Sequence, residues 1–240
     1  MLKYARMDSK KETRRITIFA GHYGSGKTNI ALNYARFLRK ADPRGEVAVA
    51  DLDIVNPYFR TKDSAGELAA EGIALVVSPF ANSNVDFPAM PKEIYPLVEP
   101  RSATRVVMDV GGDDRGALAL GRYVGDIRAG GDWEMLAVVN ASRPLTRTPE
   151  DAVEVLREIE SACGLEFTGV VNNTNLGQAT TAADVLASLP FADKVADMTG
   201  LPLRFTCCAA PLARELAPHF GESAPLFPLD IQKLYYQLEP

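Results

Sequence analysis

Eight consecutive residues combine glycine, lysine and threonine at a spacing that suits the binding of a phosphate group. They are Gly21, His22, Tyr23, Gly24, Ser25, Gly26, Lys27 and Thr28. A loop that surrounds a phosphate points several backbone N–H groups inward, and glycines permit the φ angles that this needs. In the pattern G-x-x-x-x-G-K-[ST], the lysine reaches the β- and γ-phosphates and the hydroxyl ligates Mg²⁺. The run therefore predicts a nucleotide-phosphate site, with Lys27 as its cation and Thr28 as a metal ligand.

The segments on either side match the elements that such a P-loop requires. Residues 15–20 form a short apolar run that is typical of a buried strand. Apolar residues then recur at helical spacing over 27–40, and Asp42 and Pro43 end that pattern. The N-terminus of this helix adds the positive end of its dipole to the site. The alternative is an ordinary glycine-rich turn before a helix.

Two aspartates lie where a second apolar run, residues 46–51, comes to its end. Asp51 and Asp53 are separated by one residue, so strand alternation places both side chains on the same side. Such a pair suits an Mg²⁺ shell and the orientation of an attacking water. We expect Asp51 to belong to the metal site and Asp53 to be catalytic. Aspartates that simply end a strand are the alternative.

A third apolar run, residues 105–109, ends in an aspartate and is followed by two glycines. This pattern predicts that Asp109 reaches the metal, usually through a water molecule. Gly112 is expected to approach the γ-phosphate with its backbone N–H and to move when that phosphate leaves. Asp113 and the residues after it are either part of this switch or, more commonly, the start of a solvated helix.

An asparagine ends a further apolar run, residues 167–172. The amide of Asn172 offers both a donor and an acceptor, which suits the edge of a purine base. A guanine site of the N-K-x-D type would need an aspartate at position 175, where this chain has Asn175. We therefore expect adenine as the base and Asn172 as its reader. The alternative is an Asx turn, for which asparagine is well suited.

Together these motifs resemble the MinD/ParA/CobQ-type family of P-loop nucleotide-binding proteins, of the SIMIBI class, over about residues 15–210. The runs at 21–28, 51–60 and 171–177 are similar to those of a bacterial ATP-binding subgroup. The resemblance implies a mostly parallel sheet, MgATP and often a nucleotide-dependent homodimer. It assigns phosphate binding, Mg²⁺, the attacking water, the Walker B position and adenine to Lys27, Thr28, Asp53, Asp109 and Asn172, respectively.

The chain departs from that family directly after the first glycine of the loop. The family has a signature lysine there that acts across the dimer, whereas this chain has His22. A protonated histidine can also contact phosphate. The departure nevertheless puts the lysine-in-trans mechanism in doubt. The cysteine ligands of the family's iron–sulfur members are also missing, because the cysteines are Cys163, Cys207 and Cys208, with no C-x-x-C.

The bulk composition narrows the class of protein. The 240 residues are 47% hydrophobic and 24% charged, as in an ordinary soluble globule, and the net charge of −5 gives no sign of a nucleic-acid partner. An odd number of cysteines favours a cytoplasmic location. Residues 1–13 suggest a disordered tail rather than a signal peptide. The C-terminal apolar stripe from Ile231 to Leu238 is not basic, so we expect it to pack on protein rather than on a membrane.

Strand and helix patterns alternate along the chain, which predicts one doubly wound, mostly parallel α/β domain over residues 14–240. The expected strands are 15–20, 46–51, 73–78, 105–109, 134–140, 167–172 and 203–208. The expected helices are 27–40, 62–71, 115–128, 149–162, 180–199 and 211–218. Thr148, Pro149 and Asp151 signal the start of the helix over 149–162, and Gly164 signals its end. The proline-rich segment 79–100 is either a partner or substrate loop or a rigid crossover with a short helix near 92–98.

Three functions fit this sequence. The first is a cytoplasmic Mg²⁺-dependent ATPase that binds ATP and ADP and acts as a switch on a protein partner. The second is a small-molecule ligase or kinase with a fold like that of dethiobiotin synthetase, whose acceptor would use Arg60, Asp113 or the 79–100 segment. The third is an ATP sensor that does not hydrolyse its ligand. Fold alone does not separate them.

Overall fold

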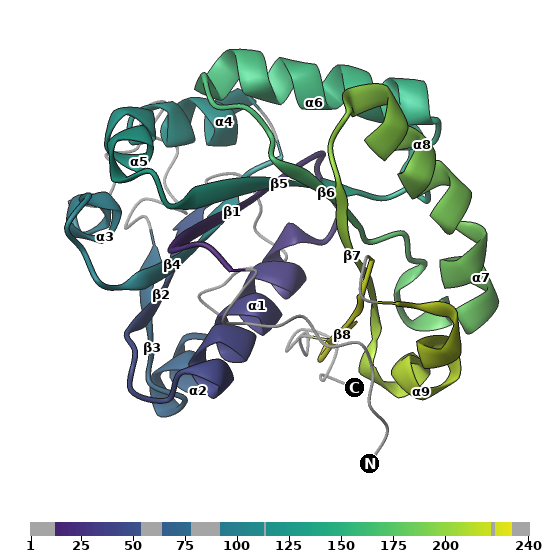
Figure 1. Ribbon diagram of the computed structural model, residues 1–240, viewed down its shortest axis with the longest axis horizontal. Helices are drawn as coiled ribbons and strands as arrows, with labels where there is room; N and C mark the ends of the chain where they lie inside the picture. Colours follow the sequence, from purple (N-terminus) through teal and green to yellow (C-terminus); the bar gives the residue numbers. More distant parts are fainter. Residues whose placement is uncertain (1–12, 54–63, 78–91, 113, 222–223, 232–240) are drawn as a thin grey trace, which may run out of the picture.

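A single sheet of eight parallel strands forms the centre of the part of the chain that the structure describes (Figure 1). The computed structural model describes residues 13–53, 64–77, 92–112, 114–221 and 224–231. The strand order is β3-β2-β4-β1-β5-β6-β7-β8, so β1 lies between β4 and β5. The strands are β1 Ile16–Ala20, β2 Val47–Leu52, β3 Ile73–Val77, β4 Arg105–Val110, β5 Trp133–Val139, β6 Gly169–Asn172, β7 Leu203–Ala209 and β8 Leu226–Leu229. The predicted parallel α/β fold is confirmed.

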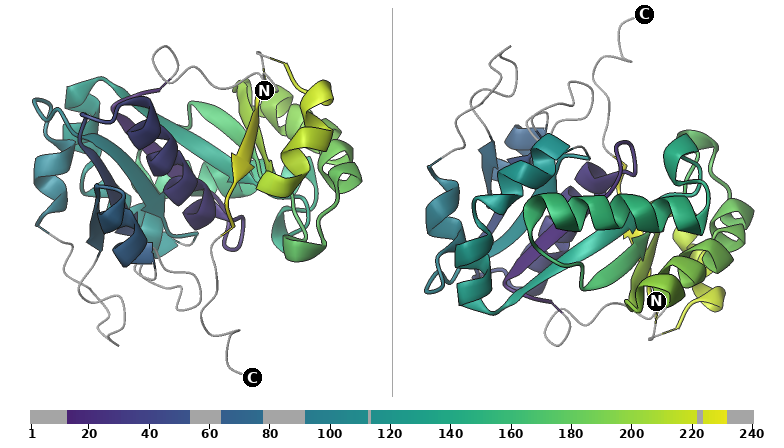
Figure 2. Two further views of the ribbon diagram at one scale, coloured as in Figure 1. Left: turned by 90° about the horizontal axis from the view of Figure 1, so that it is seen from below. Right: turned by 90° about the horizontal axis from the view of Figure 1, so that it is seen from above.

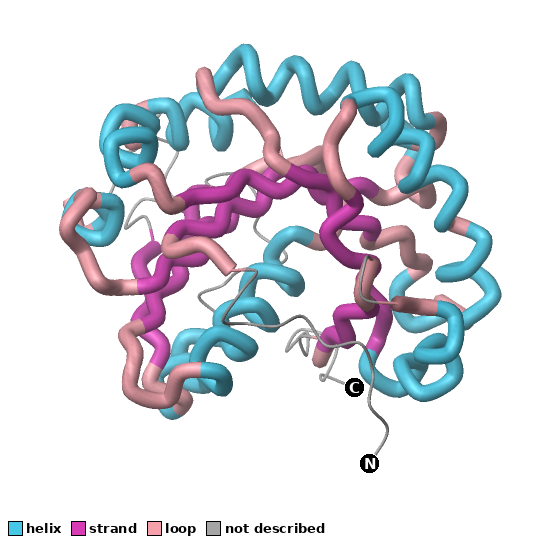
Figure 3. Tube along the Cα trace, viewed as in Figure 1, coloured by secondary structure: helices cyan, strands magenta, loops and turns pink. Residues whose placement is uncertain are grey.

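Helices cover both faces of this sheet (Figures 2 and 3). One face carries α1 Lys27–Ala41 and α2 Ala65–Ala70. The other face carries α3 Ile94–Val98, α4 Asp114–Gly121, α5 Val124–Gly130, α6 Pro149–Cys163 and α8 Leu189–Thr199. Two further helices, α7 Ala182–Ala187 and α9 Ala213–Leu216, pack beside β7 and β8. Every residue of β1 and β2 is buried, as expected for strands covered on both sides.

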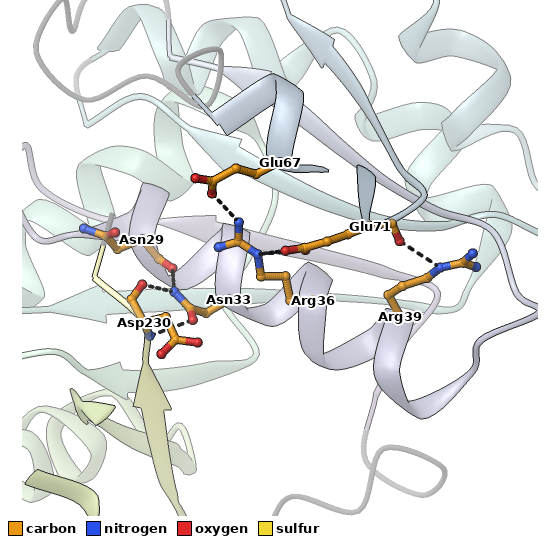
Figure 4. Close-up of polar contacts among 7 residues, drawn as sticks. All are labelled: Asn29, Asn33, Arg36, Arg39, Glu67, Glu71 and Asp230. Carbon is orange, nitrogen blue, oxygen red and sulfur yellow. Dashed lines mark hydrogen bonds and ion pairs between the residues drawn. The ribbon is translucent and has the colours of Figure 1, made fainter. Parts of the chain in front are cut away.

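Polar contacts hold α1 against elements from distant parts of the sequence (Figure 4). The guanidinium of Arg36 pairs with Glu67 at 2.9 Å and with Glu71 at 2.8 Å, which ties α1 to α2. Asn33 donates to the carbonyl of Asp230 at 3.0 Å and accepts from its N–H at 2.9 Å. These contacts fix the position of α1, whose N-terminus follows the predicted P-loop.

Three of the expected helices are interrupted. The helix expected over 115–128 breaks into α4 and α5, because a turn at Arg122 and Tyr123 buries the Tyr123 ring against Tyr95 of α3. The helix expected over 180–199 breaks into α7 and α8 next to Pro190, whose missing N–H cannot continue a helical ladder. The helix expected over 211–218 is one short turn, α9, between 3₁₀ turns at Ala210–Leu212 and Ala217–His219.

One strand was not predicted, and some of the sequence predictions concern residues outside the described part of the chain. The strand β8 was not predicted from the sequence. It contains Pro228, and proline within a sheet is confined mainly to edge strands, where β8 lies. A short helix near 92–98, which was one of the two alternatives for segment 79–100, is present as α3. The capping box of α6 is confirmed, with Thr148 accepting from the N–H of Asp151 and Gly164 at its end. Residues 1–12, 54–63, 78–91, 113, 222–223 and 232–240 lie outside the described part. The predictions for Arg60, for Asp113 and for most of the C-terminal stripe therefore fall outside it.

A buried acid lies in the sheet at the end away from the predicted P-loop. Glu134 is the second residue of β5 and lies beside Thr17 of β1, whose hydroxyl donates to its carboxylate at 3.0 Å. Arg204 of β7 pairs with the same carboxylate at 3.2 Å. Burial raises the pKa of the Glu134 carboxyl, and Arg204 opposes that shift. An ionised carboxylate at this position therefore costs stability.

We expect the substitution Glu134→Gln to flatten the dependence of stability on pH. Because the folded pKa of Glu134 lies above the ordinary value of 4.5, the folded chain keeps a proton that the unfolded chain has lost. The free energy of unfolding therefore falls as the pH rises from 4.5 through the folded pKa. Urea unfolding at a series of pH values should show a smaller fall for the glutamine variant. Equal falls would contradict this account, and the exposed Glu166→Gln is the control.

Candidate functional site

The glycine-rich run forms the connection between β1 and α1. β1 ends at Ala20 and α1 begins at Lys27, so residues 21–26 follow the carboxyl end of a strand inside the sheet. The chain leaves β1 for β2 on one side of it and later returns to form β5 on the other side. Ligands of open α/β sheets bind where the strand order diverges in this way. The predicted phosphate loop thus lies at the expected end of the expected strand.

Glycine is required in this loop for two separate reasons. Gly24 and Gly26 have φ angles of 74° and 92°, which residues with side chains seldom adopt. In addition, the Nδ2 atom of Asn173 occupies the space that a Cβ at residue 26 would need, and it donates to the carbonyl of Ser25 at 2.6 Å. Asn173, which follows β6, therefore fixes the shape of the loop. Only the three-dimensional structure brings the glycine-rich loop and the end of β6 together, so no sequence motif marks Asn173.

The loop and the start of the helix after it provide groups that can bind an anion. The ammonium of Lys27 is buried and donates to the carbonyl of His22 at 3.1 Å, inside the loop. The hydroxyl of Ser25 is buried without a hydrogen-bond partner. α1 begins with no side-chain cap and no acidic residue in its first turn, so its positive dipole end is not offset by the chain itself. Together these features give a cradle for phosphate oxygens.

The predicted metal ligands lie together at the carboxyl ends of neighbouring strands. The hydroxyl of Thr28 donates to Oδ2 of Asp109 at 2.7 Å. Asp51 of β2 and Asp109 of β4 are partners in the parallel register, so their Cα atoms lie side by side. Burial, and next the negative charge of Asp51, raise the pKa of Asp109 to about 8. Burial and the neighbouring Asp51 thus disfavour the charged form of Asp109, and a bound cation would favour it.

These residues fit a bound Mg²⁺ ion. Oδ1 of Asp109 is buried and has no hydrogen-bond partner, so this atom is available as a ligand. Among the described residues, no three His, Cys, Asp or Glu side chains are arranged to hold a metal by themselves. In a nucleotide site Mg²⁺ keeps several waters and takes phosphate oxygens as ligands, so one or two protein ligands are enough. The donor set is thus hydroxyl and carboxylate oxygen, which suits a hard cation.

Asp53 lies between the predicted metal ligands and the glycines that follow β4. Its N–H donates to the carboxylate of Asp51 at 2.9 Å, and its side chain is half-buried. A Cβ added at Gly111 would lie 3.3 Å from Oδ1 of Asp53, and one at Gly112 would collide with the backbone of Tyr23. The structure therefore brings Asp53, the two glycines and the first part of the loop into one group.

Asn172 is buried and uses its amide within the chain. Its Nδ2 donates to the hydroxyl of Ser188 at 2.8 Å, and its Oδ1 accepts from the N–H of Thr174 at 3.1 Å. The second of these bonds forms an Asx turn, which is the alternative that the sequence left open. Asn175 accepts from Gly177 in the same way, at 3.1 Å. The role of Asn172 as a base reader stays a prediction.

An open cavity of about 480 Å³ adjoins the loop on the side of α6. His22 and Gly112 line it together with Leu145 and the acidic side chains of Glu154 and Glu158. A larger hollow of about 990 Å³ lies on the outer side of α6, beside α4 and α8. None of the predicted site residues lines the larger hollow, so only the smaller cavity belongs to this site. Within the described segments, no helix has the length and apolarity needed to cross a bilayer.

No protein-family model and no curated protein matches the sequence. Solved structures do match the fold. The crystal structure of signal recognition particle 54 kDa protein from Aeropyrum pernix K1 in complex with GDP matches with a TM-score of 0.50 and 18% identity, over 82% of this chain and 42% of that one. FtsY from Mycoplasma mycoides matches with a TM-score of 0.51 and 16% identity, over 84% of this chain and 62% of that one. At such identities the likeness shows the fold alone.

Proposed function

We propose that this chain is a Mg²⁺-dependent ATP-binding protein that hydrolyses ATP and acts as a nucleotide-driven switch on a protein partner. The observation that carries the proposal is the 2.7 Å contact between Thr28 and Asp109 at the start of α1, beside a carboxylate oxygen with no other partner. A hydroxyl and a carboxylate placed this way beside a phosphate loop form the metal half of an NTPase site. We also propose membership of the MinD/ParA/CobQ-type family, on the motifs quoted above.

Each side chain then has a separate task. Lys27 leaves the carbonyl of His22 and donates to the β- and γ-phosphates. Thr28 and Asp109 would hold Mg²⁺, and the carboxylate of Asp51 would help to balance its charge. When bound, Mg²⁺ would act as a Lewis acid on the phosphate oxygens. Asp53 orients the attacking water from its half-buried position. Backbone N–H groups of Gly21, Gly24 and Gly26 and the unpartnered hydroxyl of Ser25 would complete the phosphate cradle, and His22 and Tyr23 belong to the same loop.

The switch resides in the contact between the loop and the glycines after β4. Because Gly112 packs directly on the backbone of Tyr23, a change in the γ-phosphate shell displaces the start of α4 as well. A partner or a second copy of the chain would read that displacement. Size-exclusion chromatography of the chain with MgATP and with MgADP tests this part. Elution that differs between the two nucleotides supports a nucleotide-dependent homodimer, and identical elution contradicts it.

A second candidate function is the transfer of phosphate to a small molecule. The cavity of about 480 Å³ favours it, because His22 and Gly112 open directly into that space. An enzyme of this kind would show little turnover until its acceptor is present, whereas a switch hydrolyses ATP slowly on its own. Phosphate release from MgATP without any acceptor therefore separates the two functions.

The base of the nucleotide is expected to be adenine. Position 175 lacks the carboxylate that the amino group and ring N–H of guanine would need, and a buried unpaired group costs about 1–3 kcal/mol. ATP should therefore displace a fluorescent nucleotide at a lower concentration than GTP does. The neighbour from Aeropyrum pernix was crystallised with GDP, which makes this competition informative. A clear preference for GTP would contradict the assignment of adenine.

A further inference from the structure

An arginine outside the sequence motifs lies against the phosphate loop. Arg143 follows β5, which is the neighbour of β1, so it leaves the sheet at the same edge as the loop. A tight turn holds it there. The N–H of Arg143 donates to the carbonyl of Asn140 at 3.2 Å, and its carbonyl accepts from the N–H of Thr146 at 3.2 Å. The hydroxyl of Thr146 also donates to Asn140, at 3.0 Å. The backbone at Arg143 is therefore well fixed.

The side chain of Arg143 crosses the loop at a glycine. A Cβ added at Gly24 would lie 3.5 Å from Nε of Arg143 and 3.7 Å from both Cδ and Cζ. The guanidinium group thus packs on the Cα of Gly24, close to the backbone N–H groups that would surround a phosphate.

This guanidinium has no counter-ion among the described residues. Its Nε is buried without a hydrogen-bond partner, and no carboxylate in the described segments pairs with it. A buried donor that stays unpaired costs free energy, and arginine retains its charge at any pH of interest. Bracing of the loop does not account for the Nε atom, because no loop carbonyl accepts from it. An anion that arrives with a ligand would satisfy it.

We propose that Arg143 contacts a phosphate group of the bound nucleotide and positions it in the loop, as a second cation beside Lys27. This inference rests on the proposed nucleotide-binding function and adds a residue that the P-loop motif does not contain. The planar guanidinium presents several N–H donors in a fixed fork, which matches phosphate oxygens better than a single ammonium does. Because it contacts phosphate, Arg143 contributes equally whether the base is adenine or guanine.

The test compares Arg143→Ala and Arg143→Lys with the wild-type chain by calorimetry, using MgADP, MgATP and magnesium pyrophosphate as ligands. The alanine variant should bind either all three ligands or MgATP alone about 10-fold or more weakly than the wild-type chain does. This loss corresponds to one charge-assisted contact. The lysine variant should recover part of this loss. Arg147→Ala removes the same charge from an exposed position on the same segment and should bind like wild type.

Salt separates a phosphate contact from a purely structural role. If Arg143 contacts phosphate, raising the ionic strength should weaken binding by the wild-type chain more steeply than binding by Arg143→Ala. Affinities of Arg143→Ala within twofold of wild type for all three ligands would overturn the inference. So would an equal dependence on salt, or no recovery in Arg143→Lys. A wild-type chain that binds none of the ligands would overturn the proposed function itself, and this inference with it.

Discussion

Replacing Lys27 with alanine is expected to abolish measurable binding of MgATP while leaving the fold intact. The ammonium of Lys27 is buried in the loop, where it donates to the carbonyl of His22 at 3.1 Å. The shape of the loop comes from its glycines and from Asn173, so it does not depend on this side chain. Calorimetry should show a loss of affinity of about 100-fold or more, as for a buried charge-assisted contact to phosphate.

A matched control for this experiment lies on the same helix. Lys40 is exposed in the last turn of α1, far along the helix from the loop, so Lys40→Ala removes an equal charge without touching the site. Its affinity for MgATP should equal that of wild type. Thermal unfolding should give similar midpoints for all three chains. Wild-type affinity in Lys27→Ala would rule out the P-loop assignment.

The substitution Asp53→Ala is expected to leave MgATP binding largely intact and to slow hydrolysis by about 100-fold or more. Asp53 is proposed to orient the attacking water, and that contact matters more in the transition state than in the bound ground state. Its half-buried side chain beside Gly111 places it next to the switch rather than in the Thr28–Asp109 pair. Phosphate-release kinetics and calorimetry on the same samples separate the two effects.

Asp109→Ala provides the contrast for that variant. It removes a metal ligand, so binding and Mg²⁺ dependence should weaken together, unlike the result for Asp53→Ala. If the chain forms a nucleotide-dependent complex, Asp53→Ala should hold that complex on size-exclusion chromatography, because the γ-phosphate persists. An Asp53→Ala chain that hydrolyses ATP at the wild-type rate would remove Asp53 from the mechanism and make Asp51 the better candidate.

The parts of the fold that were predicted correctly depend on local signals. Buried parallel strands appear as continuous apolar runs, and the capping box and glycine at the ends of α6 define that helix within a few residues. The breaks in the expected helices were missed because tertiary packing decides them. The turn before α5 is a clear case, since it serves to bury Tyr123 against Tyr95 on another helix.

The candidate site also combines residues that local sequence motifs predict with residues that only the tertiary structure brings together. Thr28 and Asp109 were each predicted to serve the metal, because the motif defines one and the strand end the other. The parallel sheet brings them into direct contact, at 2.7 Å. No sequence motif marks Asn173 or Arg143, since each reaches the loop from the segment that follows another strand, β6 or β5. Asn172 illustrates a pattern with two interpretations, and in this structure its amide is engaged in an Asx turn.

The central claim is that the chain itself hydrolyses ATP. The most direct test is phosphate release from MgATP by the wild-type chain alone, with no acceptor and with the Lys27→Ala chain as the baseline. We predict slow release that requires Mg²⁺ and is lost when EDTA removes the metal. Release no faster than that of Lys27→Ala would contradict the claim.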